Sequence, residues 1–328
     1  MTGRRYWIAL VVSVSVLGAV CTLLPWMGTR YALVWMFLFS VWLTLAVSYD
    51  IVGGHLGYMN LGHSAFFGLG AYATVLLLNL GCSLPTSLGA AALLAASVAV
   101  LISWPLFRLR GAYFALGTFG LISLMAAVVT NLRDWTGGSG GISAPPGDHT
   151  VAACYLSMAV AGCTMALRYH LARSHFGLTL RAIREDEEAA RGLAAQVILY
   201  KCAALVLSSI PAGVIGGVYA WNLTYISPDS VFGLEVALSP VVMAMLGGTG
   251  ALAGPVLGVC FVTVVQELLW TKMPYFHLTV YGAIMVCVGL FLPGGLVRAG
   301  WLRSLARRTG ILPVMDRRDA CPTFRSSQ

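Results

Sequence analysis

The stretch YALVWMFLFSVWLTLAVSY, residues 31–49, contains no Asp, Glu, Lys or Arg. A helix that crosses the hydrocarbon core of a bilayer needs about 20 predominantly apolar residues, and this stretch has that length. It is followed closely by a glycine-rich segment, GGHLGYMNLGHSAFFGLGAY, residues 53–72. The two together predict a membrane-spanning helix that leads into a segment of less regular backbone.

The composition extends this interpretation to the whole chain. Of 328 residues, 59% are hydrophobic and only 10% are charged, whereas soluble domains carry about 25% charged residues. The net charge of +8 does not indicate nucleic acid, because the basic residues lie between apolar runs as topogenic charges do. The eight cysteines include no CxxC pair, so neither a disulfide framework nor a zinc site is expected. Membrane lipid is the expected surrounding of this chain.

The apolar runs predict an all-α, polytopic transmembrane helical bundle of about ten spans. Residues 1–300 form the expected permease domain, and residues 301–328 form a cytoplasmic tail that is expected to be disordered. Two of the glycine-rich runs, 61–80 and 233–246, could instead be half-helices that enter the membrane and turn back. The expected spans are 6–24, 31–49, 61–80, 85–106, 112–132, 151–167, 202–221, 233–246, 252–270 and 277–293.

The distribution of basic residues predicts the orientation of the spans. With a cytoplasmic N-terminus, all 20 Lys and Arg except Arg30, Arg133 and Lys272 lie on the cytoplasmic side. This agrees with the excess of Lys and Arg in cytoplasmic loops of membrane proteins. We therefore expect a multi-pass protein of the cell inner membrane with both termini in the cytoplasm. Asp50 and His55 fall in a cytoplasmic turn, where we expect them to be solvated.

Two glycine-rich stretches, 53–72 and 246–258, interrupt the pattern of plain apolar helices. Irregular backbone at membrane depth is tolerated in protein or along a water-filled cavity, and paired interruptions indicate a solute site. The alternative is close helix packing through small residues, and His63 could simply bond to a neighbouring helix. The candidate residues of a substrate pathway are Asn60, His63, Ser64, Tyr72, Gly247, Gly248 and Gly250.

One acidic residue, Glu267, lies within an expected span, close to its outer end. It could bind the ammonium group of a substrate, or it could be solvated at the membrane interface.

The longest expected cytoplasmic loop runs from residue 168 to 201. It contains RAIREDEEAARGLA, residues 181–194, in which charged residues alternate with an apolar stripe. Good helix formers dominate, so we predict one short amphipathic helix that Gly192 ends. Such a helix is either a solvated connector or a docking element for a partner protein.

Several motifs in this order resemble the LivM branch of the branched-chain amino-acid permeases of ABC importers. Glu188-Ala189-Ala190-x-Gly192 is similar to the core of the loop that such permeases present to their ATPases. The other matching motifs, over roughly residues 30 to 295, are GYMNLGHSAFFGLGAY (57–72), LRGAYFALGTFG (109–120), TGGSGGI (136–142) and MLGGTGALAGPVLG (245–258).

The resemblance implies a permease that works with a LivH-like second permease, LivG/LivF-like ATPases and a periplasmic substrate-binding protein. It also implies that ATP and Mg are bound by the partner ATPases, and that this chain binds no cofactor. The implied ATPase-coupling residues are Arg184, Glu185, Asp186, Glu187, Glu188, Ala189, Ala190 and Gly192.

Three function classes stay open at this point. The first is an importer permease for branched-chain amino acids (Leu, Ile, Val). The second is the same machine with another cargo, such as urea, amides or other amino acids. The third is a secondary transporter or channel, which the 168–201 loop disfavours. An enzyme is not expected, because no catalytic residues, metal ligands or GxxxxGK[ST] phosphate-binding loop are found in the sequence.

Overall fold

The computed structural model describes residues 30–109, 111–192, 196–251, 253–272 and 282–283. The expected first span at 6–24 and the expected tail at 301–328 lie outside these residues. The expected last span at 277–293 also lies outside them, apart from residues 282 and 283. The other expected spans fall in the described part of the chain, apart from residue 252.

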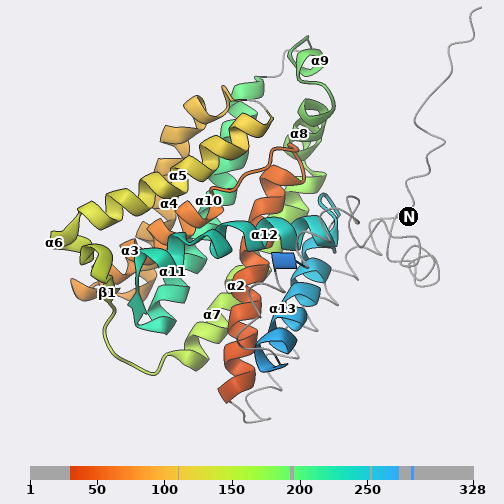
Figure 1. Ribbon diagram of the computed structural model, residues 1–328. Helices are drawn as coiled ribbons and strands as arrows, with labels where there is room; N and C mark the ends of the chain where they lie inside the picture. Colours follow the sequence, from red (N-terminus) through yellow and green to blue (C-terminus); the bar gives the residue numbers. More distant parts are fainter. Residues whose placement is uncertain (1–29, 110, 193–195, 252, 273–281, 284–328) are drawn as a thin grey trace, which may run out of the picture.

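The described residues form a bundle of helices with one small two-stranded sheet at one end (Figure 1). The longer helices are α2 (Arg30–Gly53), α3 (His63–Asn79), α4 (Leu84–Leu106), α5 (Ala112–Asn131), α7 (Thr150–Arg173), α10 (Val197–Leu223), α12 (Leu234–Gly247) and α13 (Gly254–Lys272). The short elements are α6 (Arg133–Thr136), η2 (Gly138–Gly140), β1 (Ile142–Ser143), α8 (His175–Glu185), α9 (Glu187–Gly192), β2 (Tyr225–Ile226) and α11 (Pro228–Phe232).

The bundle agrees with the expected all-α, polytopic class. In the described part of the chain, six helices are long and apolar enough to cross a membrane, with α11 and α12 taken as one. Helix α5 ends one residue before the expected boundary. Helix α3 has 17 residues, which at about 1.5 Å per residue gives roughly 25 Å, and α13 is counted only as a shorter apolar helix. The count of ten spans therefore stays a prediction.

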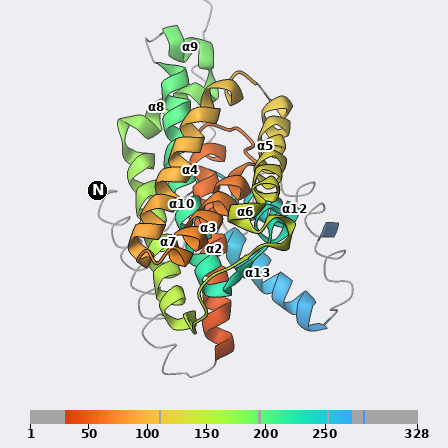
Figure 2. The same cartoon turned by 90° about the vertical axis from the view of Figure 1, so that its left-hand side faces the viewer.

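Contacts between helix ends show which of these ends lie together at each end of the bundle. At one end, Arg30 of α2 forms an exposed ion pair with Asp148, just before α7, at 3.2 Å. Asn79 at the end of α3 donates a hydrogen bond to the Ser143 carbonyl oxygen in β1, at 3.0 Å. The C-terminal end of α3 therefore lies beside β1. At the other end, the α8–α9 segment lies beyond the last turns of α2 and α7 (Figures 1 and 2).

The sheet closes the end that carries Arg30 and Asp148. Strand β1 pairs antiparallel with β2, with Ile142 opposite Ile226. The Tyr225 hydroxyl donates a hydrogen bond to the Gly140 carbonyl oxygen at 2.8 Å. The TGGSGGI motif thus links the segment after α5 to the segment after α10 at this end.

The core depends on a close crossing of α3 and α10, which both also contact α4. A Cβ atom on Gly70 of α3 would overlap the Gly213 carbonyl of α10, and one on Gly216 would overlap the Phe67 carbonyl. The two backbones therefore touch, which lets Ala212 and Ile215 become fully buried. Close approach through small residues is a common way to associate helices in a membrane, where the lipid gives no hydrophobic drive.

The close crossing predicts a loss of stability for Gly216→Ala. The added methyl group has no room beside the Phe67 carbonyl, and overpacking of this kind costs about 1–3 kcal/mol. Gly162→Ala in α7 is the matched control, because a Cβ there meets no atom within 4 Å. In thermal unfolding of the detergent-solubilised chain, Gly216→Ala should lower Tm, whereas Gly162→Ala should leave it unchanged or raise it. Equal Tm values for the two variants would contradict the described crossing.

Candidate functional site

The 168–201 loop contains two short helices where one was predicted. Helix α7 continues to Arg173, α8 then spans His175–Glu185, and α9 spans Glu187–Gly192. The break falls at Asp186, whose backbone is extended (φ −153°, ψ 111°). Its Oδ1 atom accepts hydrogen bonds from the N–H groups of Glu188 at 2.8 Å and Ala189 at 3.0 Å. The prediction of a single helix is thus wrong, because an Asp side chain satisfies free N–H groups at a helix start and favours a new helix there.

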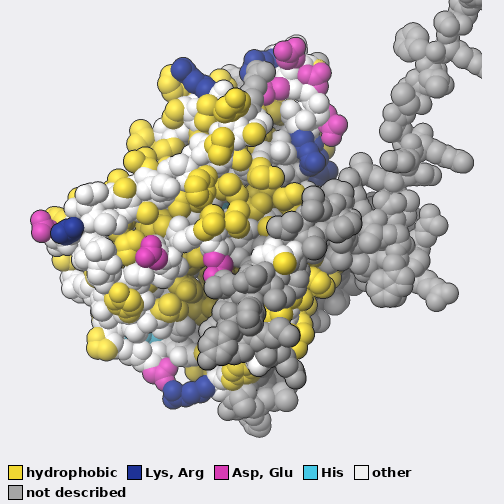
Figure 3. Space-filling model, viewed as in Figure 1, with side chains coloured by type: hydrophobic (Ala, Val, Ile, Leu, Met, Phe, Trp, Pro, Cys, Tyr) yellow, Lys and Arg dark blue, Asp and Glu magenta, His cyan; other side chains and the backbone are white. Residues whose placement is uncertain are grey.

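The helices α8 and α9 are amphipathic, as predicted. Leu180, Ile183 and Ala190 are buried against the bundle, whereas Glu185, Asp186, Glu188 and Ala189 are exposed. Figure 3 shows charged side chains of both signs around this segment at the top, and hydrophobic side chains over the middle of the same face. The coupling residues inferred from the motif therefore present a mostly acidic surface at one end of the bundle.

Gly192 is the last residue of α9. Its φ is not in the left-handed region, and a Cβ atom there would meet no atom within 4 Å. The described part of the chain thus gives no steric reason for glycine at this position.

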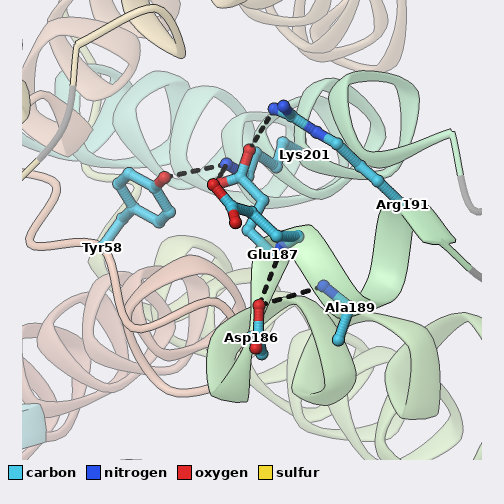
Figure 4. Close-up of polar contacts among 7 residues, drawn as sticks. Tyr58, Asp186, Glu187, Ala189, Arg191 and Lys201 are labelled. Atoms are coloured by element: carbon cyan, nitrogen blue, oxygen red, sulfur yellow. Dashed lines mark hydrogen bonds and ion pairs between the residues drawn. The ribbon is translucent and has the colours of Figure 1, made fainter.

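A buried lysine ties α9 to two other parts of the bundle (Figure 4). Lys201 of α10 is 2% exposed, and its Nζ atom donates to Glu187 Oε2 at 2.7 Å and to the Tyr58 hydroxyl at 2.8 Å. The other oxygen of Glu187 accepts a hydrogen bond from Arg191 at 2.6 Å. A charge can be buried at low cost only when it is paired and hydrogen-bonded. This cluster therefore holds α9 against α10 and against the first glycine-rich stretch.

A second buried cluster joins α2, α7 and the second glycine-rich stretch. Asp50 of α2 and Arg168 of α7 form an ion pair, with side chains that are 0% and 1% exposed. Asp50 Oδ1 also accepts a hydrogen bond from the Gly250 N–H at 3.0 Å, and Arg168 donates one to the Ala251 carbonyl oxygen at 2.9 Å. The loop between α12 and α13 is thus held by two charged side chains from other helices.

The expectation that Asp50 and His55 are solvated is wrong. Both are at most 1% exposed. Asp50 is buried because Arg168 neutralises its charge. Burial, reinforced by the nearby Arg168 guanidinium, lowers the pKa of the His55 imidazole. Its surroundings thus favour the neutral imidazole, and its Nδ1 atom lies 3.3 Å from the Asp50 carbonyl oxygen.

A third contact links α8 to the first glycine-rich stretch. The Arg184 guanidinium donates a hydrogen bond to the Gly54 carbonyl oxygen at 2.6 Å. Gly57, which has a positive φ of 76°, lies directly beside the same side chain. Sequence reasoning placed Arg184 in the coupling set, but it did not identify the contact between Tyr58 and Lys201 or the pair of Asp50 and Arg168.

The candidate pathway residues of the first stretch are all buried, at most 3% exposed. The Asn60 side-chain oxygen accepts a hydrogen bond from the Gly62 N–H at 2.9 Å and so supports the start of α3. The His63 ring packs edge-on against Tyr49 at 5.8 Å between centroids. Within the described residues, Asn60 Nδ2, Ser64 Oγ and the Tyr72 hydroxyl have no hydrogen-bond partner. These atoms form a set of polar groups on α3 and on the segment just before it, inside an apolar bundle.

The candidate glycines of the second stretch form a turn and a close helix contact. A Cβ atom on Gly247 would overlap the Gly254 carbonyl of α13, and one on Gly258 would overlap the Met243 carbonyl of α12. Gly248 and Gly250 have positive φ values of 108° and 83°. Gly247, Gly248 and Gly250 thus serve close helix packing and a turn, which was the alternative to a role in a substrate pathway. The structure nevertheless brings the two stretches together, because Gly250 bonds to Asp50 and lies beside the Gly54 carbonyl oxygen.

The fold and these clusters define a class of protein: a polytopic helical membrane protein with a structured segment outside its candidate spans. Residues 31–289 match the family described as the permease component of the branched-chain amino acid transport system. The match covers most of the chain, so the protein belongs to this family.

The relatives agree with this assignment. The high-affinity branched-chain amino acid transport system permease protein LivM of Escherichia coli K12 is 27% identical over 83% of this chain and 71% of its own length. LivM of Salmonella typhimurium is 26% identical over the same shares. The autoinducer 2 import system permease protein LsrC of Escherichia coli is 28% identical over 74% of this chain and 72% of its own. No solved structure matches the chain. The chain is thus a LivM-type permease, an integral inner-membrane transport component.

The buried pair predicts a large effect of Asp50→Leu. Removing one partner leaves the Arg168 charge buried without compensation, which costs about 3–5 kcal/mol. Thermal unfolding in detergent should show a strongly lowered Tm, while Asp148→Asn, in the exposed pair with Arg30, should change it little. The double variant Asp50→Leu/Arg168→Leu should recover stability relative to Asp50→Leu, because no unpaired charge remains. A double variant no more stable than Asp50→Leu would contradict the ion pair.

Proposed function

We propose that this chain is one of two permease subunits of an ATP-driven importer that carries branched-chain amino acids across the inner membrane. A LivH-like permease supplies the other half of the pathway, LivG/LivF-like ATPases supply the energy, and a periplasmic binding protein delivers the solute. Both termini and the α8–α9 segment face the cytoplasm, as the distribution of Lys and Arg favours.

The observation that carries the proposal is the arrangement of α8 and α9. They place exposed acidic residues on the surface at one end of the bundle, while the contacts of Glu187 with Lys201 and of Arg184 with Gly54 hold the segment against α10 and the first glycine-rich stretch. A solvated connector would need no such anchoring. A segment that transmits a movement of the ATPase does need such contacts. It can transmit that movement only if it is bound both to the ATPase and to the rest of the permease.

The residues proposed to couple this chain to the ATPase are those of the family motif. Their roles differ in the structure: Asp186 caps α9, Glu187 and Arg184 bond inward, and Glu188, Ala189 and Gly192 face outward. The outward residues contact the ATPase. The open space over Gly192 supports a close approach of the partner backbone there.

The proposed solute pathway runs beside α3. Asn60, Ser64 and Tyr72 offer polar atoms that have no partner within the described residues, and His63 lies in the first turn of α3 with Ser64. A polar side chain inside a membrane is costly unless it has a partner, which makes such atoms candidates for solute or water contact. We assign no substrate contact to Gly247, Gly248 and Gly250, whose turn and packing explain their identity.

The LivM relatives favour branched-chain amino acids as the cargo. The LsrC relative, whose name gives autoinducer 2 as its cargo, shows that similar permeases serve other solutes. Urea, amides and other amino acids remain the alternative cargoes of the same machine. Uptake assays with radiolabelled leucine, competed by each alternative, distinguish them.

The test of the proposed function is Gly192→Asp in the full complex. The substitution adds bulk and an unpaired charge at the proposed contact, which costs several kcal/mol and weakens binding about a hundredfold or more. The variant should insert normally, retain less ATPase in a pull-down, and lose ATP-driven uptake into vesicles. Gly140→Asp is the control for ATPase binding, because Gly140 is exposed at the opposite end and a Cβ there meets no atom within 4 Å. Full ATPase retention and full uptake by Gly192→Asp would show that the segment is a passive connector.

A further inference from the structure

The buried charged side chains of the described residues gather at one end of the bundle. Asp50, Arg168 and Lys201 are each at most 2% exposed, and all bond to loops or helix ends near α8 and α9. Burying a charge is expensive, so a protein keeps buried ionic groups where they fix a particular arrangement of its parts. Here each of them joins segments that are far apart in the sequence.

Two contacts begin on the α8–α9 segment and end on the loop before α3, and the buried Lys201 takes part in one of them. Arg184 of α8 holds the Gly54 carbonyl oxygen at 2.6 Å. Glu187 of α9 reaches Tyr58 through Lys201, by contacts of 2.7 and 2.8 Å (Figure 4). The loop at 54–62 is therefore held from α8 at its start and from α9 in its middle.

The same loop is joined to the turn between α12 and α13. Asp50, in the last turn of α2, accepts a hydrogen bond from Gly250, and the Gly54 carbonyl oxygen lies beside Gly250. Arg168 adds the contact with Ala251. Glycines with positive φ, Gly57 and Gly248, flank these contacts. The two loops thus each contain a glycine in a conformation that other residues rarely adopt, and charged contacts join one loop to the other.

We propose that Arg184 and Glu187 are positioning residues that transmit movement of the α8–α9 segment to both glycine-rich loops. The Asp50–Arg168 pair makes the loop before α3 and the turn after α12 move as one unit. The inference rests on the proposed function for the source of the movement. The contacts themselves belong to this chain alone, so they can be tested without the ATPase.

The first test measures the accessibility of the α12–α13 turn in the purified full-length permease. A single cysteine replaces Thr249, which is half-buried in this turn, in a background without the eight native cysteines. Arg184→Ala should raise the rate of maleimide labelling at position 249 by roughly 2- to 30-fold, the range seen when coupled sites are uncoupled. Tyr58→Phe, which removes only the hydroxyl that Lys201 contacts, should act in the same direction.

Arg181→Ala is the matched control, because it removes the same charge from the same helix, and among the described residues Arg181 acts on the 54–62 loop only through its charge near His55. Arg181→Ala should leave the labelling rate at position 249 unchanged. Arg184→Lys keeps a donor at position 184 and should label more slowly than Arg184→Ala. Unchanged labelling in Arg184→Ala, or an equal increase in Arg181→Ala, would overturn the proposal whatever the chain transports.

The second test uses the assembled importer. Arg184→Ala should keep ATPase association near the wild-type level while more ATP is hydrolysed per solute taken up, again by roughly 2- to 30-fold. Loss of ATPase association in this variant would overturn the assigned role, since Arg184 would then be a docking residue. A wild-type chain that binds no ATPase would instead refute the proposed function, and the labelling result would still decide whether the contacts transmit movement.

Discussion

The ion pair between Asp50 and Arg168 is the contact that organises the functional end of this bundle. It joins the last turn of α2 to α7, and both side chains also bind the backbone of the turn between α12 and α13. Because neither charge reaches solvent, neither side chain can leave its partner without a large loss of stability. The loop before α3 and the α8–α9 segment are then placed against this fixed point by Arg184 and Lys201.

In the rest of the bundle, helices are held together by close contact between their backbones. Helices α3 and α10 touch through Gly70, Gly213 and Gly216, and α12 and α13 touch through Gly247 and Gly258. In lipid, packing of this kind replaces the hydrophobic drive that holds soluble helices together. The protein thus separates two tasks: small residues hold the spans together, and charged residues hold the loops at one end.

The sequence predicts the positions of the long helices well, because the length of an apolar run and the placement of Lys and Arg depend only on the membrane. Helix α5 is predicted to within one residue for this reason. The burial of Asp50 was not predictable in the same way. A charged residue at the end of an apolar run is expected to face water, and its partner Arg168 lies on a helix that is distant in the sequence. The break at Asp186 was not predicted, because good helix formers surround it in the sequence. The side chain of this one residue instead caps a new helix, α9. Of the candidate site, the sequence predicts Arg184 and the acidic α9 through the motif, but not Tyr58, which carries no signal of its own.

The central claim is that α9 faces the cytoplasm and contacts an ATPase. A photoreactive amino acid at position 188, which is exposed on α9, tests it in the assembled complex, with position 135 at the opposite end as the control. On irradiation, position 188 should cross-link to the ATPase subunit in good yield, and position 135 should not. If position 188 gave no cross-link to the ATPase, or if only position 135 did, the account of how this permease is coupled to ATP hydrolysis would be contradicted.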